Sequence, residues 1–578
     1  MKSSIKYIAA LLLASFLVGC SEDFLDLKPL GRPSTESFYT DFESLDYTAT
    51  SAYGMLCSRD VYDIMYSIGF QSASDDSEVG GENTSDWPEF QVIDRFTHTT
   101  KEARIHRFYA YVYKGIRMTN EFLTRVDEIR EIENAKIKSP AEHDATNALI
   151  DLRIAEMHYL QAFYHFTLVQ VYGGVPIMDV LGGGEEQSMA RSSIAEVLHF
   201  IESELEAAIP DLKEKSELDL NQGRATKGAA RALLAKAYLY ESSYAKNYGG
   251  DSRFADCETK YDLALKYAED VILSEEYLLV GENGERFPSW NSSTGLPVGG
   301  FRWMFTLDGD NCDGSVFEIQ SLNDGAEWTR SRGNYMTVYT TVRFCYASDG
   351  TPGQSAGGWS FNLPTKYLVA AFGNKDTRET GLNSSPVDED LDPRFATTVG
   401  RAGDLVKVGS EWFEMDFQNL PTETISRKYE CSYDEYWGSM YDFHGGPINI
   451  RLIRFADVVL MAAEAAYEEG DMGEALAYVN RVRTRARASG DTGYPEDLST
   501  LSFEDIVHER RLELAMESSR FFDLVRWNLT EQFIKGTTLA SMGEGFIIDF
   551  ESGKHEFLPI PAVIMQKNSA LEQYQAWK

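Results

Sequence analysis

Apolar residues recur at steps of three and four along several long segments of the chain, a spacing that places them on one face of an α-helix. In residues 150–176 this apolar stripe consists of Leu152, Ala155, Tyr159, Ala162, Phe166 and Val169. Gly173 and Gly174 then favour a left-handed helix end, and Pro176 prevents continuation. Similar stripes run through residues 101–130, 192–209, 226–244 and 258–274. The pattern predicts a set of packed helices in this half of the chain.

A second helical block begins near residue 450. Its segment FADVVLMAAEAAYEEGDMGEALAYVNRVRTRA predicts two helices that meet at Gly470 and Asp471. Ala463 before the turn and Ala475 after it are small enough to let the two helices pack closely. The arrangement resembles a tetratricopeptide helical hairpin, but the tryptophan and glycine of the full consensus are absent. A regular repeat array is therefore not predicted.

Helical periodicity is lost between the two blocks. Gly, Pro, Asn and Asp interrupt short apolar runs such as SVFEIQ and YMTVYTTVRF, which predict a few strands and long loops. Long loops inside an ordered protein often carry binding residues. We expect a ligand site in this region.

The first residues combine a basic start with an apolar run. Lys2 and Lys6 precede residues 7–18, which are almost uninterruptedly apolar, and Cys20 follows. The run is shorter than the about 20 residues that span a bilayer, so it predicts a secretory signal. A buried N-terminal helix is the alternative. Such a helix would show polar residues at helical spacing, whereas Ser15 is the one polar position in this run. The stretch LVGC resembles the bacterial lipobox, which makes Cys20 the predicted lipidated residue, anchored by its acyl chains.

These patterns predict five segments. Residues 1–19 are the expected lipoprotein signal peptide, and residues 20–40 the lipidated N-terminus and linker. The N-terminal helical part covers residues 41–280, the loop-rich ligand-binding region residues 281–450, and the C-terminal helical part residues 451–578.

Net charge and cysteine content argue against nucleic-acid binding, a cysteine zinc site and a disulfide framework. The formal net charge of −37 disfavours nucleic-acid partners. The chain has 6 cysteines and no Cys-x-x-Cys pair. The cysteines that follow Cys20 are Cys57, Cys257, Cys312, Cys345 and Cys431. Their wide spacing argues against a zinc site and against a disulfide framework.

Six motifs occur along the chain in an order that resembles one known family. They are CSEDFLDLKP, YLQAFYHFTLVQVYGGVPI, LDPRF at 391–395, RFADVVLMAAEAAYEEG, ERRLELAMESSRFFDLVRWN at 509–528 and HEFLPIPAVIMQKNSALEQ. Together they resemble the SusD/RagB family of Bacteroidetes nutrient-binding lipoproteins. The resemblance implies a mainly α-helical SusD-like fold, with tetratricopeptide-like helix pairs packed against an irregular, loop-rich region with a few short strands.

The resemblance also implies a function. It predicts a noncatalytic lipoprotein, exposed on the cell exterior and anchored in the outer membrane, that needs no cofactor. This lipoprotein delivers oligosaccharides or polysaccharides to a SusC-like TonB-dependent transporter, and Ser21, Glu22 and Asp23 resemble a surface-export signal. Three alternatives stay open: a surface glycoside hydrolase, a peptide-binding RagB-like nutrient receptor, and a scaffold that binds only protein.

Tryptophans in polar stretches are the candidate ligand contacts. Sugars present apolar C–H faces and a rim of hydroxyls, so a capture site needs aromatic platforms with polar neighbours. The first candidates are Trp87, Asp75, Asp76 and Asn83. The next candidates are Trp290, Trp303, Trp328 and Trp359. For each tryptophan alone, burial in the core is the alternative interpretation.

Metal sites are weakly indicated. The stretch DGDNCDG offers Asp308, Asp310 and Asp313 to a calcium ion, but Cys312 stands where an oxygen donor is needed. A plain turn is the favoured interpretation. His158 and His165 share a helix face without a third ligand nearby, so we expect ordinary core or groove histidines.

The motif at 509–528 contains acids and arginines at helical spacing. Arg510 with Glu513, Glu513 with Glu517, and Glu517 with Arg520 are three or four residues apart, and Asp523 precedes Arg526 by three. This spacing predicts an ion-pair ladder along a helix. A catalytic carboxylate among Glu513, Glu517 and Asp523 is the alternative, disfavoured because neighbouring arginines keep acids ionised.

Overall fold

The computed structural model covers a mainly α-helical protein, as predicted. It describes residues 38–81, 83, 85–136, 139–181, 189–218, 223–289, 292–322, 333–346, 354–355, 358–373, 391–401, 403–408, 411–417, 420–431, 437–439, 442–443, 445–490, 493–540 and 546–578. Cys20 and the rest of the predicted signal and linker up to residue 37 lie outside this part of the chain, as do Trp290 and Trp328. Within it, no helix has the length and apolar character that crossing a membrane requires.

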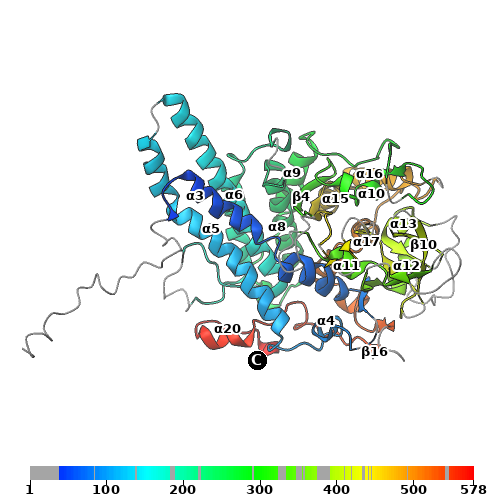
Figure 1. Ribbon diagram of the computed structural model, residues 1–578. Helices are drawn as coiled ribbons and strands as arrows, with labels where there is room; N and C mark the ends of the chain where they lie inside the picture. The colour runs from blue at the N-terminus through cyan, green and yellow to red at the C-terminus, as the bar shows by residue number, and fades with distance from the viewer. Residues whose placement is uncertain are drawn as a thin grey trace, which may run out of the picture.

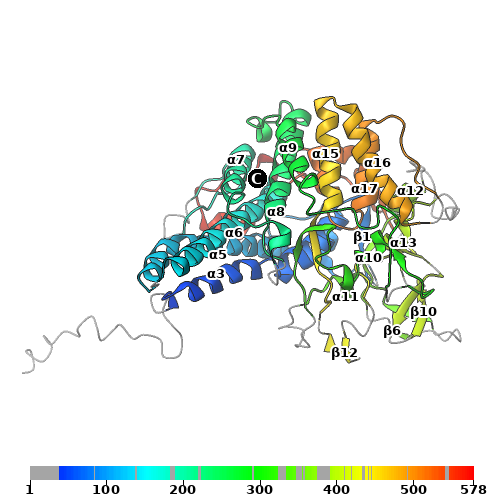
Figure 2. The same ribbon diagram turned by 90° about the horizontal axis from the view of Figure 1, so that it is seen from above.

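The longer helices form one row in which each helix packs against the next (Figure 2). In chain order the row consists of α5 (Ala103–Lys136), α6 (Pro140–Tyr172), α7 (Ile194–Ala208), α8 (Lys227–Asn247), α9 (Tyr261–Ile272), α15 (Phe455–Glu469) and α16 (Met472–Ala488). Helix α3 (Phe42–Gly54) packs on α5 and α6 at one end of the row. The helices predicted from apolar periodicity are thus confirmed.

The helix ends follow the predicted capping residues. Gly173 ends α6 with a φ of 69°, and Gly470 ends α15 in the left-handed conformation, with a φ of 87°. The side chain of Asp471 then caps α16 by accepting a hydrogen bond from the Glu474 amide at 3.1 Å. Ala463 and Ala475 are fully buried between the two helices. The α15–α16 hairpin has the form that its sequence predicts.

Shorter helices pack around this row (Figure 1). They are α4 (Pro88–Asp94), α10 (Gly300–Trp303), α11 (Met336–Thr340), α12 (Lys366–Phe372), α13 (Phe395–Thr398), α17 (Phe503–Leu514), α18 (Arg520–Arg526), α19 (Thr530–Phe533) and α20 (Ala562–Lys567). A wide π-type helix, η2 (Arg59–Phe70), packs on α5. The 3₁₀ turns are η4 (Lys215–Glu217), η5 (Ser252–Phe254), η6 (Leu307–Gly309) and η9 (Gln575–Trp577).

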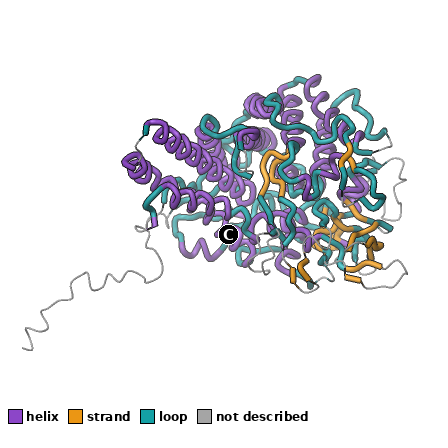
Figure 3. Tube along the Cα trace, turned by 45° about the horizontal axis from the view of Figure 1, so that its top comes forward, coloured by secondary structure: helices purple, strands orange, loops and turns teal. Residues whose placement is uncertain are grey.

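The strands are short, antiparallel and gathered mainly at one end of the molecule (Figure 3). The largest sheet has the order β6 (Gln354–Ser355), β5 (Phe344–Tyr346), β10 (Glu411–Asp416) and β9 (Leu405–Val408). The paired strands are β1 (Ser77–Gly80) with β7 (Phe361–Pro364), β14 (Ile450–Arg454) with β4 (Ser315–Ile319), β11 (Ile425–Ser426) with β8 (Val399–Gly400), β12 (Trp437–Ser439) with β13 (Asp442–Phe443), β15 (Thr538–Leu539) with β16 (Phe546–Ile547), and β2 (Arg286–Phe287) with β3 (Val298–Gly299). The strand predicted from SVFEIQ is confirmed as β4.

One large hydrophobic core runs through the described chain. It contains residues from Leu45 near the start to Leu571 near the end, and side chains of the helix row form most of it. Two smaller clusters lie in the irregular part, one around Phe372 and Phe395 and one around Cys345. The segment boundaries at residues 280 and 450 stay predictions.

Candidate functional site

A short antiparallel strand pair brings two distant tryptophans to the same place. In the β1–β7 pair, Ser77 lies opposite Pro364 and Gly80 lies opposite Phe361. The amide of Gly81 continues the pairing by donating to the carbonyl of Ser360 at 2.8 Å. Trp87 follows β1 and Trp359 precedes β7, so the pairing sets the two residues on one side of the irregular region.

Helix α11 lies beside β7 and contributes a third aromatic residue, Tyr339. The amide of Trp359 donates to the carbonyl of Val338 at 2.7 Å, and the amide of Ser360 donates to the carbonyl of Thr341 at 3.1 Å. These two hydrogen bonds fix the backbone before β7 against the end of α11. Tyr339, on α11, therefore lies beside Trp359.

The rings form a cluster that we call the aromatic site, defined as Trp87, Tyr335, Tyr339, Trp359 and Phe361. The centroid of the Trp87 ring lies 4.6 Å from that of Phe361 and 4.9 Å from that of Tyr339. Trp359 lies 5.5 Å from Tyr339 on the same measure, and Tyr335 stacks on Tyr339 at 6.0 Å. Tyr339 is 0% exposed, whereas both tryptophans are partly exposed. Two accessible indoles thus share one buried phenol ring.

The backbone of the aromatic site adopts strained conformations. Trp87 has a φ of 51° and a ψ of 57°, the left-handed region, and it directly precedes Pro88. Ser360 and Asn362, on either side of Phe361, both have a φ of 56°. Such conformations cost non-glycine residues about 1–3 kcal/mol each, and they concentrate at functional sites. The positions of Trp87 and Phe361 are therefore set by backbone geometry that the surrounding packing maintains.

Charged side chains surround the aromatic rings. The guanidinium of Arg59 lies over the Tyr335 ring, 4.2 Å from its centroid, and its Nε donates to the Tyr339 hydroxyl at 2.9 Å. Arg343 lies 3.5 Å from the carboxylate of Asp86, which directly precedes Trp87. These arginines and Asp86 supply hydrogen-bonding groups at the edge of the rings.

A buried carboxyl group, that of Asp63, holds the backbone at the start of α11. Both Oδ atoms of Asp63, on η2, accept from the Tyr335 amide, at 3.0 and 2.9 Å. Burial raises the pKa of Asp63 to about 7, and Asp60 adds to the rise, while the Tyr335 amide and Arg59 lower it. Asp63 therefore ties η2 to the start of α11 and titrates near neutral pH.

The structure corrects part of the sequence prediction for this site. Asn83 is exposed in the turn that leads to Trp87, where its carbonyl accepts from the Asp86 amide at 3.0 Å. Asp75 and Asp76, in contrast, are buried, because Arg511 and Arg520 bind their carboxylates at 2.7–2.9 Å. Both carboxylates thus join the C-terminal arginines to the segment before β1 and do not lie on the surface beside Trp87.

Trp303 belongs to a different part of the molecule. It stacks on Phe287 of the β2–β3 hairpin, with the ring centroids 4.5 Å apart and the planes 19° apart. It is partly buried there against the main core. The structure thus joins Trp87 and Trp359, but leaves Trp303 apart from them.

Sequence reasoning missed Tyr335, Tyr339 and Arg59. The segment YMTVYTTVRF predicts a strand, but half of it forms α11, with β5 at its end. The two tyrosines are four residues apart and so share a face on a helix or on a strand, which is why their spacing did not distinguish the two. Arg59 had no signal of its own, because its partners come from the middle of the chain.

The calcium interpretation of residues 308–314 is not supported. The Oδ atoms of Asp310 accept from the Asn449 amide at 3.1 and 3.2 Å, and Oδ1 also accepts from Arg451 at 3.1 Å. Asp308 and Asp313 are exposed, and Asp313 lies 3.6 Å from the ammonium of Lys215. Asp310 already has a cationic partner, so this stretch is a turn with structural ion pairs.

The two histidines on α6, His158 and His165, contact other side chains or the backbone, as expected for core or groove histidines. His158 Nδ1 lies 2.7 Å from the carboxylate of Glu204. His165 is buried, and its Nδ1 lies 2.8 Å from the carbonyl of Gln161.

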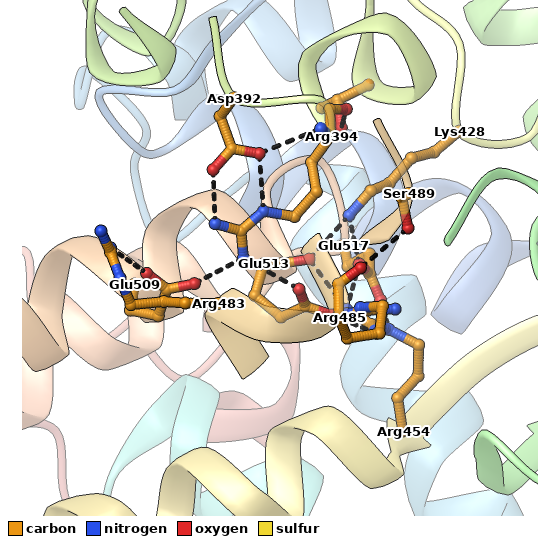
Figure 4. Close-up of polar contacts among 11 residues, drawn as sticks. Asp392, Arg394, Lys428, Arg454, Arg483, Arg485, Ser489, Glu509, Glu513 and Glu517 are labelled. Atoms are coloured by element: carbon orange, nitrogen blue, oxygen red, sulfur yellow. Dashed lines mark hydrogen bonds and ion pairs between the residues drawn. The ribbon is translucent and has the colours of Figure 1, made fainter. Parts of the chain in front are cut away.

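The C-terminal motif forms a buried ion network rather than a helical ladder (Figure 4). Helix α17 ends at Leu514, and Met516 and Ser518 have left-handed backbones, so Glu517 lies outside any helix. The Glu513 carboxylate binds Arg394 at 3.0 Å, Arg454 at 2.8 Å, and also Arg485. For Glu513 and Glu517 the predicted ladder is therefore wrong, because these acids pair with cations from other elements.

Glu517 and Arg510 also pair with residues from other elements. Glu517 binds Arg454 at 2.6 Å and also Lys428, and Arg510 joins Asp457 at 2.9 Å. The predicted Asp523–Arg526 pair is confirmed at 2.9 Å.

The arginines of the network keep the Glu513 carboxylate ionised. Burial would raise the pKa of Glu513, but Arg485, Arg454 and Arg394 together hold this pKa well below its ordinary value. A carboxylate that stays ionised cannot deliver a proton as a general acid. The network therefore joins α16, α17 and β14 to the loop around Arg394, and it does not form a catalytic dyad.

Comparison with known proteins agrees with this architecture. One family model, described as "SusD family", matches residues 314–577, and another, described as "Starch-binding associating with outer membrane", matches residues 23–239. Fold and matches define a helical protein of the SusD-like class. The chain belongs to the SusD/RagB family.

Individual relatives are distant but cover the whole chain. "SusD-like protein P2" of Formosa agariphila is 23% identical over 99% of this chain and 98% of its own. A solved SusD-like protein from Bacteroides fragilis superposes with a TM-score of 0.72 at 22% identity, covering 95% of this chain and 99% of that one. A solved "Laminarin binding SusD-like protein" has a TM-score of 0.67 at 23% identity, covering 93% and 100% of the two chains.

Proposed function

We propose that the protein is a lipoprotein of the outer membrane that captures oligosaccharides or polysaccharides at the aromatic site and delivers them to a SusC-like TonB-dependent transporter. The observation that carries the proposal is the position of Trp87 and Trp359, both partly exposed and both in contact with Tyr339. Two indoles held by one buried ring form a rigid apolar platform.

The chemistry of the site suits a neutral sugar chain. The C–H face of a pyranose packs on an aromatic ring, while its hydroxyls need donors and acceptors at the ring edge. Arg343, Asp86 and Asn83 lie on the segments that carry the two tryptophans, so they are placed to supply those groups.

Relatives support the same ligand class. A solved protein with this fold is described as laminarin-binding, and the family model for residues 23–239 is described as starch-binding and associating with the outer membrane. Laminarin and starch oligosaccharides are therefore the first ligands to test.

The arrangement favours binding over hydrolysis. A glycoside hydrolase needs two carboxyl groups of opposite role flanking the bond that breaks. The carboxylates nearest to Trp87 are engaged by cations: Asp86 by Arg343, and Glu89 by Arg104 and by Arg107. Both acids are thus occupied in ion pairs, which favours a role in shaping the site over a role in bond cleavage.

Binding is tested by calorimetry with the full chain in detergent. We expect laminarin or starch oligosaccharides to bind, and Trp87→Ala and Trp359→Ala each to weaken binding at least tenfold. Trp303→Ala is the matched control, because Trp303 stacks on Phe287 away from the site. Equal losses in all three variants would contradict the assignment, and release of reducing ends would instead indicate a hydrolase. Retention of peptides but not glycans would favour the RagB-like alternative.

The membrane part of the proposal has its own test. Cells that express the chain should incorporate labelled palmitate, and Cys20→Ala should abolish the label. Replacing Glu22 and Asp23 with alanine should reduce exposure to external protease without changing the label. Capture of the wild-type chain with a TonB-dependent transporter, in a stable complex, tests the delivery step.

A further inference from the structure

A cluster of three ligand-type side chains lies on α7 and α8, on elements that do not contribute to the aromatic site. His199 and Glu202 are three residues apart on α7 and therefore share a face, and Glu241 comes from the neighbouring α8. His199 Nε2 lies 3.0 Å from Glu241 Oε1. One ligand atom from each of the three lies within 4.8 Å of the others.

The two carboxylates are buried without full compensation. Glu241 is 0% exposed and Glu202 is 8% exposed. Both bind the ammonium of Lys260, each at 2.8 Å, so two buried carboxyl groups share one cation. Oε1 of Glu202 is buried and accepts no hydrogen bond. A buried carboxyl oxygen without a partner is costly, and a bound cation would satisfy it.

We propose that His199, Glu202 and Glu241 bind a first-row transition-metal ion, with Zn²⁺ as the ion that fits best. One imidazole and two carboxylates are a mixed nitrogen and oxygen donor set, which suits zinc better than calcium or magnesium. Three protein ligands leave the fourth tetrahedral position to water. The His199 side chain is 46% exposed, which gives the ion a path from solvent.

The geometry needs only a small adjustment. Ligand atoms of a tetrahedral zinc site lie about 3.5 Å apart, which follows from bonds of about 2.1 Å. The His199–Glu241 pair is already at 3.0 Å, and rotation of the Glu202 carboxyl closes the rest. The Glu258 amide donates to Glu241 at 3.1 Å and orients that ligand from behind.

Lys260 is the competitor for this site. Its ammonium occupies the space between the carboxylates, and it immediately precedes α9. The side chain is partly exposed, so its flexible stem allows the ammonium to swing into water when the metal ion enters. Metal and lysine therefore bind in exchange, and each neutralises charge on the same two acids.

Titration of the untagged full chain with ZnCl₂, followed by calorimetry, tests the site. We expect one tight site per chain, and Co²⁺ to give the intense visible absorption of tetrahedral coordination. His199→Ala should weaken Zn²⁺ at least tenfold, and because His199 is half exposed this variant leaves the buried charges in place. His158→Ala is the matched control, since His158 pairs with one carboxylate, that of Glu204, at 2.7 Å.

A third variant separates a metal site from a merely structural cluster. Lys260→Gln removes the competing ammonium, so it should tighten Zn²⁺ binding several-fold while lowering the melting temperature of the metal-free protein. Absence of Zn²⁺ binding to the wild type would overturn the proposal. Equal affinities in the wild type and His199→Ala, or equal losses in His199→Ala and His158→Ala, would overturn it as well.

Discussion

The ring of Trp87 lies 4.9 Å from the ring of Tyr339, centroid to centroid, although the two residues come from separate parts of the chain. Tyr339 also contacts Trp359, at 5.5 Å, and is itself fully buried. The two partly exposed indoles thus both contact one buried ring. Removing either tryptophan takes away a contact that holds Tyr339, and so disturbs the other platform.

This dependence predicts non-additive losses of binding. In a double-mutant cycle with Trp87→Ala and Trp359→Ala, the free-energy loss of the double variant should be smaller than the sum of the single losses. We expect a coupling of about 0.5–3 kcal/mol, the range found for residues that share a partner. Calorimetry with the oligosaccharide that binds the wild type measures it. A sum that matches the double variant within about 0.3 kcal/mol would mean that the tryptophans act independently.

A substitution at Gly81 should also disturb the aromatic site. It has a φ of 86°, and an added Cβ would lie 2.6 Å from the Phe361 ring and 2.8 Å from the Asp86 carboxylate. Gly81→Ala should therefore weaken ligand binding more than tenfold, because it displaces two groups of the site. Gly284→Ala is the matched control, with a φ of 84° and no atom within 4 Å of the added Cβ. In urea unfolding, Gly284→Ala should lose about 1 kcal/mol because of its positive φ, and Gly81→Ala should lose more because its added Cβ also meets Phe361 and Asp86. Equal affinities in the two variants would contradict the prediction.

Asp63 predicts a pH dependence of stability. Burial raises its pKa to about 7 in the folded protein, from an ordinary value of 3.8. Between these values the folded protein keeps a proton that the unfolded chain has released, so the free energy of unfolding falls as pH rises. The contribution reaches at most about 1.4 kcal/mol per pH unit and ends above pH 7.

Urea unfolding at about pH 5, 6 and 7 tests this dependence. Asp63→Asn should show a shallower decline than the wild type, since the amide oxygen still accepts from Tyr335 and no longer titrates. Burial also raises the pKa of Asp310 to about 7, but that group is unchanged in both proteins and cancels in the comparison. Parallel declines would show that Asp63 does not titrate in this range.

The ion network predicts a large loss of stability from a small substitution. Glu513→Gln leaves Arg394, Arg454 and Arg485 without their shared carboxylate in a fully buried place. Removal of one partner from such a network costs about 3–5 kcal/mol. Glu531→Gln is the control, because Glu531 is 61% exposed and lies 3.7 Å from Lys535, so its loss should be below about 1 kcal/mol. Equal unfolding midpoints for the two variants in urea would contradict a structural role for Glu513.

Local patterns were sufficient to predict the helices. The apolar stripe of α6 and the Gly470 stop of α15 each depend on residues within a few turns, so their signals are contiguous in sequence. The candidate site was only half predictable for the same reason. Trp87 and Trp359 stand out in polar stretches, but Tyr339 and Arg59 acquire their role from pairings between distant segments.

The errors have a common physical cause. Asp75 and Asp76 look like surface acids because they stand in a polar stretch near Trp87, yet their arginine partners come from the far end of the chain. Glu513 and Glu517 suggest a helical ladder by spacing, but the helix ends between them. A sequence shows where charges are available, whereas the choice of partner depends on the tertiary fold.

The pairing of β1 with β7 joins two segments of the chain that different family models match. Strand β1 lies within the segment matched by one family model, residues 23–239, and β7 lies within the segment matched by the other, residues 314–577. Each part brings one tryptophan. Neither matched segment therefore holds both indoles of the aromatic site, and a substitution on either side of the pairing changes a surface to which the other segment also contributes.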